Sequence, residues 1–142
     1  MLFCDTSALM KLYVNEVGSA QMLALAQSAT SIFVAEITWV EMRAALAQRV
    51  RLQSIPLLAA DEALDRLREE WAQFQKIAAD AKLLDIAGDL AAAFGLRAYD
   101  SVQLAAASAV HKATSGQMRM CCFDKQMNGA AKVLGITVFA GE

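Results

Sequence analysis

Residues 1–14 read MLFCDTSALMKLYV, and this stretch decides the fold: an apolar run ends at Asp5 and changes to helical spacing over residues 7–14. A short apolar run before a polar turn is typical of a buried strand. The same order of strand and helix recurs along the chain. This alternation predicts an α/β fold of three layers, in which helices cover both faces of a central parallel sheet.

The other elements follow from periodicity and from turn residues. Strands are expected at residues 31–35, 74–78, 118–123 and 136–139. Helices are expected at residues 19–27, 38–51, 59–71, 80–94, 100–113 and 125–134. Because no linker or repeat divides the chain, residues 1–142 are predicted to form a single domain, with a helical excursion between residues 38 and 73.

The composition excludes several classes of protein. Of the 142 residues, 57% are hydrophobic and 20% are charged, which excludes an intrinsically disordered chain. Thirteen Lys and Arg against fifteen Asp and Glu give a net charge of -2, so any RNA binding has to be local or assisted by a metal ion. The chain start lacks the basic region of a signal peptide, and the uncharged stretch 17–35 is too polar for a membrane span. Cys4, Cys121 and Cys122 fit neither a disulfide framework nor a zinc site, so we expect a cytoplasmic protein with reduced thiols and no membrane partner.

Four acidic residues stand apart from those on amphipathic helices. Asp5 and Asp124 each follow a predicted strand, and Glu41 and Asp100 lie in the first turns of predicted helices. All four are therefore expected near the carboxyl ends of the parallel strands, where ligands bind in such folds. Two like charges ~4 Å apart repel by about 4 kcal/mol at an effective dielectric constant of 20, so converging carboxylates need a counter-charge. Mg²⁺ or Mn²⁺ would supply it, since hard cations prefer carboxylate oxygens.

Each acid also has a structural explanation. Asp5, Asp100 and Asp124 are good helix N-caps, since Asp is among the preferred residues there. Residues 38–41 match a capping box, in which Glu41 would bind the amide of the Thr38 residue. Spacing alone does not decide between caps and a metal site.

Four segments resemble the motifs of PIN-domain proteins, and of the VapC-type toxins among them. The first is LFCDTSALMKLY at residues 2–13, and the second is TWVEMRAAL at residues 38–46. The third is GLRAYDSVQLAAA at residues 95–107. The fourth, CFD at residues 122–124, is followed by Ala130-Ala131, Leu134-Gly135 and a final strand. Together they cover essentially the whole chain, in the order and spacing of the family.

The resemblance implies a PIN fold and an endoribonuclease dependent on Mg²⁺ or Mn²⁺. Its acidic residues here would be Asp5, Glu41, Asp100 and Asp124. We expect Asp5 and Asp100 to bind the ion directly, and Glu41 and Asp124 to bind it directly or through water. The resemblance also implies a homodimer and a VapB-type antitoxin that blocks the site. Apolar residues near the chain start, such as Leu9, Leu12, Tyr13, Met22, Leu23 and Leu25, exceed the needs of one small core and also favour a dimer.

Further candidates flank the four acids. Ser7 is expected to orient Asp5 or to cap its helix. Cys122 stands where the family often has Thr or Ser, and because a thiol is a weak donor, support of the fourth carboxylate is in question. Arg43 and Arg97 adjoin the second and third motifs and are candidates for binding RNA phosphates, with a surface ion pair as the alternative.

Two other functions compete with this one. A phosphatase of the haloacid dehalogenase type also begins with a strand and an Asp, but it needs a second acid two residues later, where this chain has Ser7. A catalytically degenerate PIN domain that only binds RNA or protein is the other alternative. The presence of all four acids counts against it, and Cys122 keeps it open.

Overall fold

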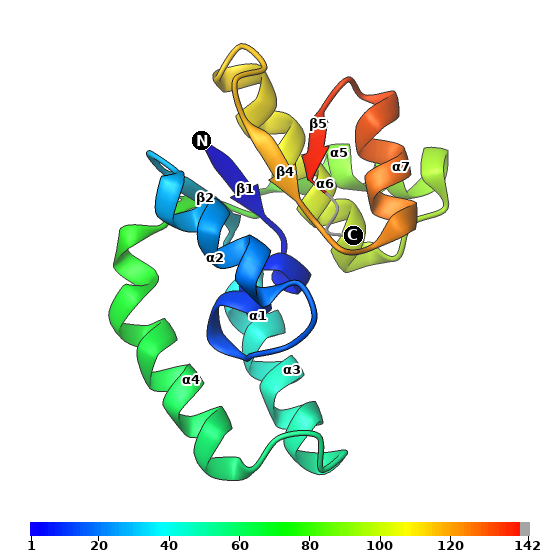
Figure 1. Ribbon diagram of the computed structural model, residues 1–142. Helices are drawn as coiled ribbons and strands as arrows, with labels where there is room; N and C mark the ends of the chain where they lie inside the picture. Colours follow the sequence, from blue (N-terminus) through cyan, green and yellow to red (C-terminus); the bar gives the residue numbers. More distant parts are fainter. Residues whose placement is uncertain (140–142) are drawn as a thin grey trace.

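In the computed structural model, which describes residues 1–139, five parallel strands form one sheet in the order β3-β2-β1-β4-β5 (Figure 1). The strands are β1 (Leu2–Cys4), β2 (Ile32–Ala35), β3 (Gln75–Ile77), β4 (Arg119–Cys121) and β5 (Thr137–Phe139). In the centre of the sheet Phe3 pairs with Phe33 on one side and with Met120 on the other. The predicted all-parallel sheet is therefore confirmed.

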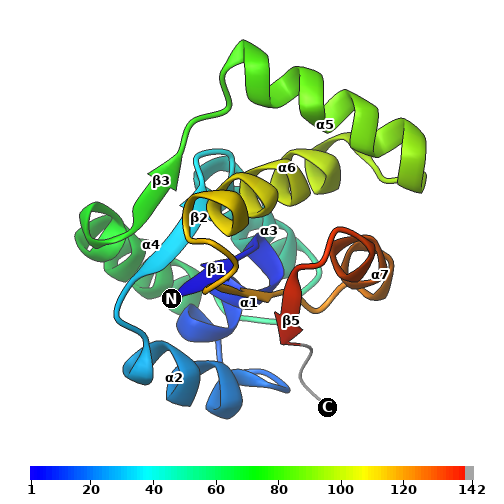
Figure 2. The same cartoon turned by 90° about the horizontal axis from the view of Figure 1, so that it is seen from above.

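Helices cover both faces of the sheet, as the alternating pattern predicts (Figure 2). One layer holds α1 (Thr6–Tyr13), α2 (Ser19–Ser28), α3 (Thr38–Arg51) and α4 (Leu57–Glu70). The other layer holds α5 (Ala81–Phe94), α6 (Ala98–Ala113) and α7 (Lys125–Val133). Side chains alternate along β1, because Leu2 and Cys4 pack against the first layer while Phe3 packs against the second. Each face of the sheet therefore has its own buried core.

The main differences from the predicted elements lie at their ends. Helix α4 begins directly after Pro56, two residues earlier than predicted, because the extended Pro56 (φ -70°) suits the position before a first helical turn. Helix α6 begins at Ala98 with Arg97 as its N-cap, so Asp100 lies inside the first turn. The hypothesis that Asp100 caps this helix is therefore wrong.

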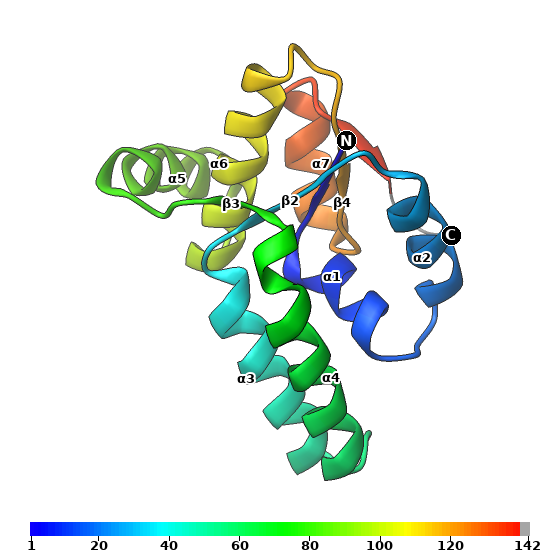
Figure 3. The same cartoon turned by 90° about the vertical axis from the view of Figure 1, so that its left-hand side faces the viewer.

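Helices α3 and α4 form an antiparallel pair that extends beyond the sheet, which confirms the predicted helical excursion (Figure 3). The pair is joined near the sheet by Trp39 and Trp71, whose ring centres are 5.1 Å apart. At its far end Leu52, Leu57 and Leu58 are 62–70% exposed.

The apolar residues near the chain start mostly serve the protein's own core. Leu9 and Met22 are completely buried, and Tyr13 is 7% exposed, whereas Leu23 is half exposed. We expected these apolar residues to exceed what one core needs, and for most of them this expectation was wrong because they are buried in the protein's own core or packed against it. Within residues 1–139, no helix combines the length and apolar character needed to cross a bilayer. The three cysteines are free and buried, as expected.

The order of the strands fixes where a ligand site can form. From β1 the chain builds outward through β2 to β3, and it then returns to the other side of β1 to form β4 and β5. The reversal lies between β1 and β4, and ligands of open parallel sheets bind at the carboxyl ends of the strands at such a point. Asp5 follows β1 and Asp124 follows β4 closely, so both lie at this position.

Candidate active site

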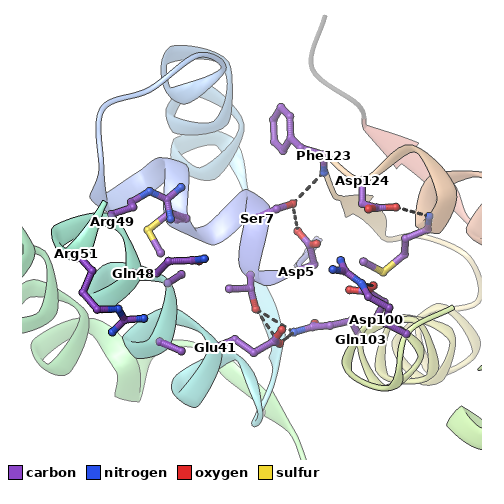
Figure 4. A pocket seen from close by; sticks show the side chains of 16 residues that line it. Asp5, Ser7, Glu41, Gln48, Arg49, Arg51, Asp100, Gln103, Phe123 and Asp124 are labelled. Atoms are coloured by element: carbon purple, nitrogen blue, oxygen red, sulfur yellow. Dashed lines mark hydrogen bonds and ion pairs between the residues drawn. The ribbon is translucent and has the colours of Figure 1, made fainter. Parts of the chain in front are cut away.

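A pocket of about 620 Å³ opens at the carboxyl ends of β1 and β4 (Figure 4). All four acids singled out in the sequence line it: Asp5, Glu41, Asp100 and Asp124. They come from four separate places, namely the ends of two strands and the first turns of α3 and α6. The fold therefore brings together carboxylates that are up to 119 positions apart in the chain.

Asp5 is both a helix cap and a residue of the pocket. Its Oδ1 accepts hydrogen bonds from the amide of Ala8 at 2.9 Å and from the hydroxyl of Ser7 at 2.7 Å. The Ser7 Oγ in turn accepts a hydrogen bond from the amide of Phe123 at 3.0 Å. Ser7 thus joins the first strand end to the segment that leads to Asp124, as expected of a residue that orients Asp5. Capping and a place in the site do not exclude each other.

Glu41 lies within a hydrogen-bonded group formed by three helices. Its Oε1 accepts from the hydroxyl of Thr6 at 2.9 Å and from Nε2 of Gln103 at 2.6 Å. The same Nε2 lies 2.8 Å from Oγ1 of Thr38. Because Glu41 faces these partners and Ile37 is the N-cap of α3, the capping-box interpretation of residues 38–41 was wrong.

Asp100 and Asp124 complete the group of acids. Asp100 Oδ2 accepts from Nε of Arg97 at 2.8 Å, an ion pair in which the arginine side chain is 84% exposed. Asp124 caps α7, since its Oδ1 accepts from the amide of Met127 at 2.8 Å. Its own amide donates to Sγ of Cys122 at 3.3 Å. The thiol therefore contacts the backbone of Asp124 rather than its carboxylate, and its hydrogen bond to the carboxylate of Asp5 works against the rise that burial causes in the pKa of Asp5.

Burial and neighbouring negative charge raise the pKa values of two of the four acids, Asp5 and Glu41. Burial raises the pKa of Asp5 to about 6, against the hydrogen bonds of Ala8 and Ser7, and the charge of Glu41 adds to the rise. Burial also raises the pKa of Glu41, although the hydrogen bonds from Gln103 and Thr6 lower it. The pKa of Arg97 is raised by its hydrogen bond to Asp100. The pocket is thus a place where negative charge is costly and a cation is favoured.

The free carboxylate oxygens bear on whether the pocket suits a metal ion. Each acid uses one oxygen in the hydrogen bonds above, and no other N–H or O–H group within residues 1–139 donates to the second oxygen; the thiol of Cys122 is a further hydrogen-bond partner of Asp5. The four free atoms are Asp5 Oδ2, Glu41 Oε2, Asp100 Oδ1 and Asp124 Oδ2. In the described part of the chain, no three His, Cys, Asp or Glu side chains are close enough to enclose one ion. Because Mg²⁺ commonly keeps several waters and takes only one or two carboxylates, two of these free oxygens could hold such an ion while the others contact its waters.

The two arginines expected to meet RNA are placed differently. Arg97 lines the pocket, but Arg43 lines only an adjacent hollow with Trp39 and Leu57, which shares Arg51 with the pocket. Arg43 follows Glu41 by two residues, which is about 200° around a helix of 3.6 residues per turn, so it points away. The last turns of α3 instead bring Arg49 and Arg51 into the pocket (Figure 4).

Arg49 and Arg51 differ in how they are held. Arg49 is 2.9 Å from Glu16, which also binds Lys11 at 3.0 Å. Arg51 is exposed and makes no ion pair within residues 1–139. Gln48 lines the same wall, and it is the residue that helical spacing places on the face of Glu41, about 20° away. The helical spacing from Glu41 was therefore the feature of the sequence that could have predicted Gln48 as a residue of the pocket.

Comparison with known proteins shows the family of the chain. The family model of the PIN domain matches residues 2–132. Two proteins named as ribonucleases, VapC45 of Mycobacterium tuberculosis strain CDC 1551 / Oshkosh and VapC49 of strain ATCC 25618 / H37Rv, are each 32% identical to the chain. Both matches extend over 110 residues, which is 78% of this chain and 76% of the relative.

Solved structures share the fold at lower sequence identity. FitAcB from Neisseria gonorrhoeae is similar with a TM-score of 0.67 and 16% identity, over 99% of this chain and 98% of that one. A toxin–antitoxin complex from Klebsiella pneumoniae is similar with a TM-score of 0.65 and 17% identity, over 100% of this chain and 98% of that one. These likenesses concern the arrangement of the backbone.

Proposed function

The chain belongs to the PIN domain family, and from this premise we propose that it is a Mg²⁺- or Mn²⁺-dependent endoribonuclease, the toxin of a VapBC-type toxin–antitoxin pair. The observation that carries the proposal is that four carboxylates line one pocket and each keeps one oxygen free. The names of the two relatives at 32% identity support RNA as the substrate.

The residues of the pocket divide the work of phosphodiester hydrolysis. Asp5 Oδ2 and Asp100 Oδ1 would hold the ion directly, with Glu41 and Asp124 contacting it through its waters. When bound, the ion supplies charge relief on the phosphate and lowers the pKa of water. In this proposal Glu41 Oε2 would hold the attacking water, and the raised pKa of Glu41 would suit it to take the proton. Asp5 is held in place by Ala8 and Ser7, so its free oxygen has a fixed direction.

The substrate backbone would contact the arginines of the pocket. Arg97 lies beside Asp100, and Arg51 lies ten residues along α3 from Glu41, about 15 Å at a rise of 1.5 Å per residue. The two cations therefore suit different phosphates of one RNA strand, at either side of the acids. With few such cations, binding should depend weakly on salt.

The salt dependence gives a test with a matched control on the same helix. Each phosphate neutralised on a single strand contributes about −0.7 to the slope of log K against log salt concentration. We expect the parent protein to neutralise about two or three phosphates, which corresponds to a slope of about −1.4 to −2.1. Arg51→Gln should make it shallower by about 0.7, while Arg43→Gln should leave it unchanged. Equal effects of both substitutions, or a parent slope for six or more contacts, would contradict this placement of the RNA.

We also propose two protein partners and a cellular location. A VapB-type antitoxin would block the site by inserting a basic side chain among the four acids; the toxin–antitoxin complex that shares the fold supports the existence of such a partner. A homodimer is supported by the exposed leucines at the far end of α3 and α4. The cytoplasm, where RNA is available, would be the place of action.

The dimer is tested by light scattering at micromolar concentration. The expected mass is twice the 15.3 kDa of one chain. If the end of α3 and α4 forms the interface, Leu58→Lys should halve the mass, whereas Leu84→Lys on α5 should not, although Leu84 is also 48% exposed. A parent that scatters as a single chain would rule out the dimer.

One assay separates the proposed function from its alternatives. RNA and p-nitrophenyl phosphate are incubated with the protein, with and without EDTA. The proposal expects cleavage of RNA only, abolished by EDTA and restored by Mg²⁺ or Mn²⁺. Hydrolysis of p-nitrophenyl phosphate would favour the phosphatase, although Ser7 counts against it because this residue stands where that enzyme needs a second acid. Binding of RNA without cleavage would indicate a degenerate domain.

A further inference from the structure

Gln103 is a buried polar residue that lies against the site. It falls within the third motif, but the sequence analysis gives it no role. It is 1% exposed and lies on α6, three residues after Asp100, so both side chains point to the same side of the helix. Its Nε2 lies 2.6 Å from Glu41 Oε1, 2.8 Å from Thr38 Oγ1 and 3.2 Å from Thr6 Oγ1. Gln103 is therefore the point at which α1, α3 and α6 meet.

The hydrogens available decide which of these contacts are bonds. A side-chain amide nitrogen carries two hydrogens, and the two shorter distances assign them to Glu41 and Thr38. The Thr6 hydroxyl gives its own hydrogen to Glu41 Oε1 at 2.9 Å. Oε1 therefore receives two hydrogen bonds, which leaves Oε2 as the oxygen of Glu41 that can serve a ligand.

The oxygen of the Gln103 amide, Oε1, shows what determines the orientation of this side chain. Gln103 Oε1 is buried and has no hydrogen-bond partner within residues 1–139. A buried acceptor without a donor is unfavourable, so other interactions must hold the amide in this orientation. A flipped amide would place Oε1 against the carboxylate oxygen of Glu41, and the two negative atoms would repel. The charge of Glu41 therefore holds the orientation of Gln103, and Gln103 in return holds Glu41.

We propose that Gln103 is a positioning residue of the active site, whose side-chain amide fixes Glu41 so that Oε2 faces the pocket. The proposal rests on the proposed function only in taking a divalent cation as the ligand that Glu41 serves. Through its backbone, Gln103 also couples the positions of two acids, because Asp100 lies one turn earlier on the same helix. A shift of α6 would move both.

The test uses Gln103→Met, which keeps the length of the side chain and removes both donors. Mn²⁺ binding, measured by electron paramagnetic resonance of the free ion, should weaken by about 10–100-fold, the usual cost of losing a group that orients a ligand. In RNA cleavage at saturating metal, kcat should fall and KM should stay unchanged. The control is Ser101→Ala, which removes another buried hydrogen bond of the same helix, from Ser101 Oγ to the carbonyl of Ala98 at 2.7 Å. It should change neither quantity.

A double-mutant cycle distinguishes positioning from a general role in packing. If Gln103 acts through Glu41, then Gln103→Met should have no further effect on Mn²⁺ binding or kcat once Glu41→Gln is present. Full additivity of the two substitutions would overturn the proposal. So would a folded Gln103→Met protein that binds Mn²⁺ and cleaves RNA as the parent does, or an equal loss in Ser101→Ala.

A second measurement needs neither metal nor activity. In the nuclear magnetic resonance spectrum of the metal-free parent, the side-chain NH₂ of Gln103 should be shifted downfield by its bond to a carboxylate, and Glu41→Gln should move it upfield. An NH₂ signal that is the same in both proteins would refute the bond, even if Gln103→Met fails to fold. If the parent binds no Mn²⁺ and cleaves no RNA, the proposed function fails, and this comparison still decides whether Gln103 holds Glu41.

Discussion

Replacing Asp5 by Asn is expected to make the metal-free protein melt at a higher temperature at pH 7 and to slow RNA cleavage by at least ~100-fold. Asp5 is 4% exposed, and burial raises its pKa from 3.8 to about 6, so its charge at pH 7 destabilises the folded state. At about 1.36 kcal/mol per pH unit, the cost is of the order of 2–3 kcal/mol. Asn caps a helix about as well as Asp, so the bond to Ala8 should survive the substitution.

The sign of the effect with pH is part of this prediction. Because the folded-state pKa of Asp5 lies above the unfolded value, the folded state binds the proton more tightly. The parent therefore loses stability as the pH rises from about 4 to about 6, and the advantage of Asp5→Asn should vanish below about pH 4. Thermal melts of both proteins at pH 4 and pH 7 measure this.

Asp80 provides the matched control. It caps α5 as Asp5 caps α1, with its Oδ1 accepting from the amide of Leu83 at 2.8 Å, but it is exposed and lies outside the pocket. Asp80→Asn should leave both melting temperature and cleavage unchanged. If Asp5→Asn behaves in the same way, Asp5 is a cap and no more.

The second large effect is the dependence of RNA cleavage on both pH and Mg²⁺ concentration. Cleavage at low Mg²⁺ is expected to fall about tenfold per pH unit below about pH 6, because Asp5 has to lose its proton before it can bind the ion. The raised pKa of Glu41 acts in the same direction. Since the ion binds only the deprotonated form, a tenfold higher Mg²⁺ concentration should move the midpoint of this fall to lower pH.

The measurement is kcat/KM from pH 5 to 8 at two Mg²⁺ concentrations. If the midpoint pH is the same at both Mg²⁺ concentrations, the group that titrates is not a ligand of the metal ion. A profile that stays flat over this range would contradict the raised pKa of the buried Asp5.

Local features of the sequence were sufficient for the layers of the fold and for the four acids. A strand and the residue that ends it lie within a few positions, so the run before Asp5 and the run before Asp124 each showed where a carboxylate meets the sheet edge. Parallel strands carry their carboxyl ends to one edge, which is why acids that are distant in sequence could be expected in one place. The comparison with the PIN family agrees with that expectation of the fold.

The partners of those acids were beyond the reach of local patterns. Gln103 contacts Glu41 across 62 positions, and this depends on how α3 and α6 are rotated about their axes and how closely they approach. The choice between Arg43 and Arg51 depends on which side of α3 faces the pocket, and proximity to a motif does not show that.

The sequence by itself determined the kind and the order of the strands and helices, because the hydrophobic period acts over a few neighbouring residues, whereas several element ends and caps differ from the prediction. Only the tertiary structure decided which oxygen of each carboxylate is free and which acids bear the cost of burial. Those properties depend on the distances, exposure and hydrogen-bond donors that neighbouring elements supply, and these exist only once the helices have packed on the sheet.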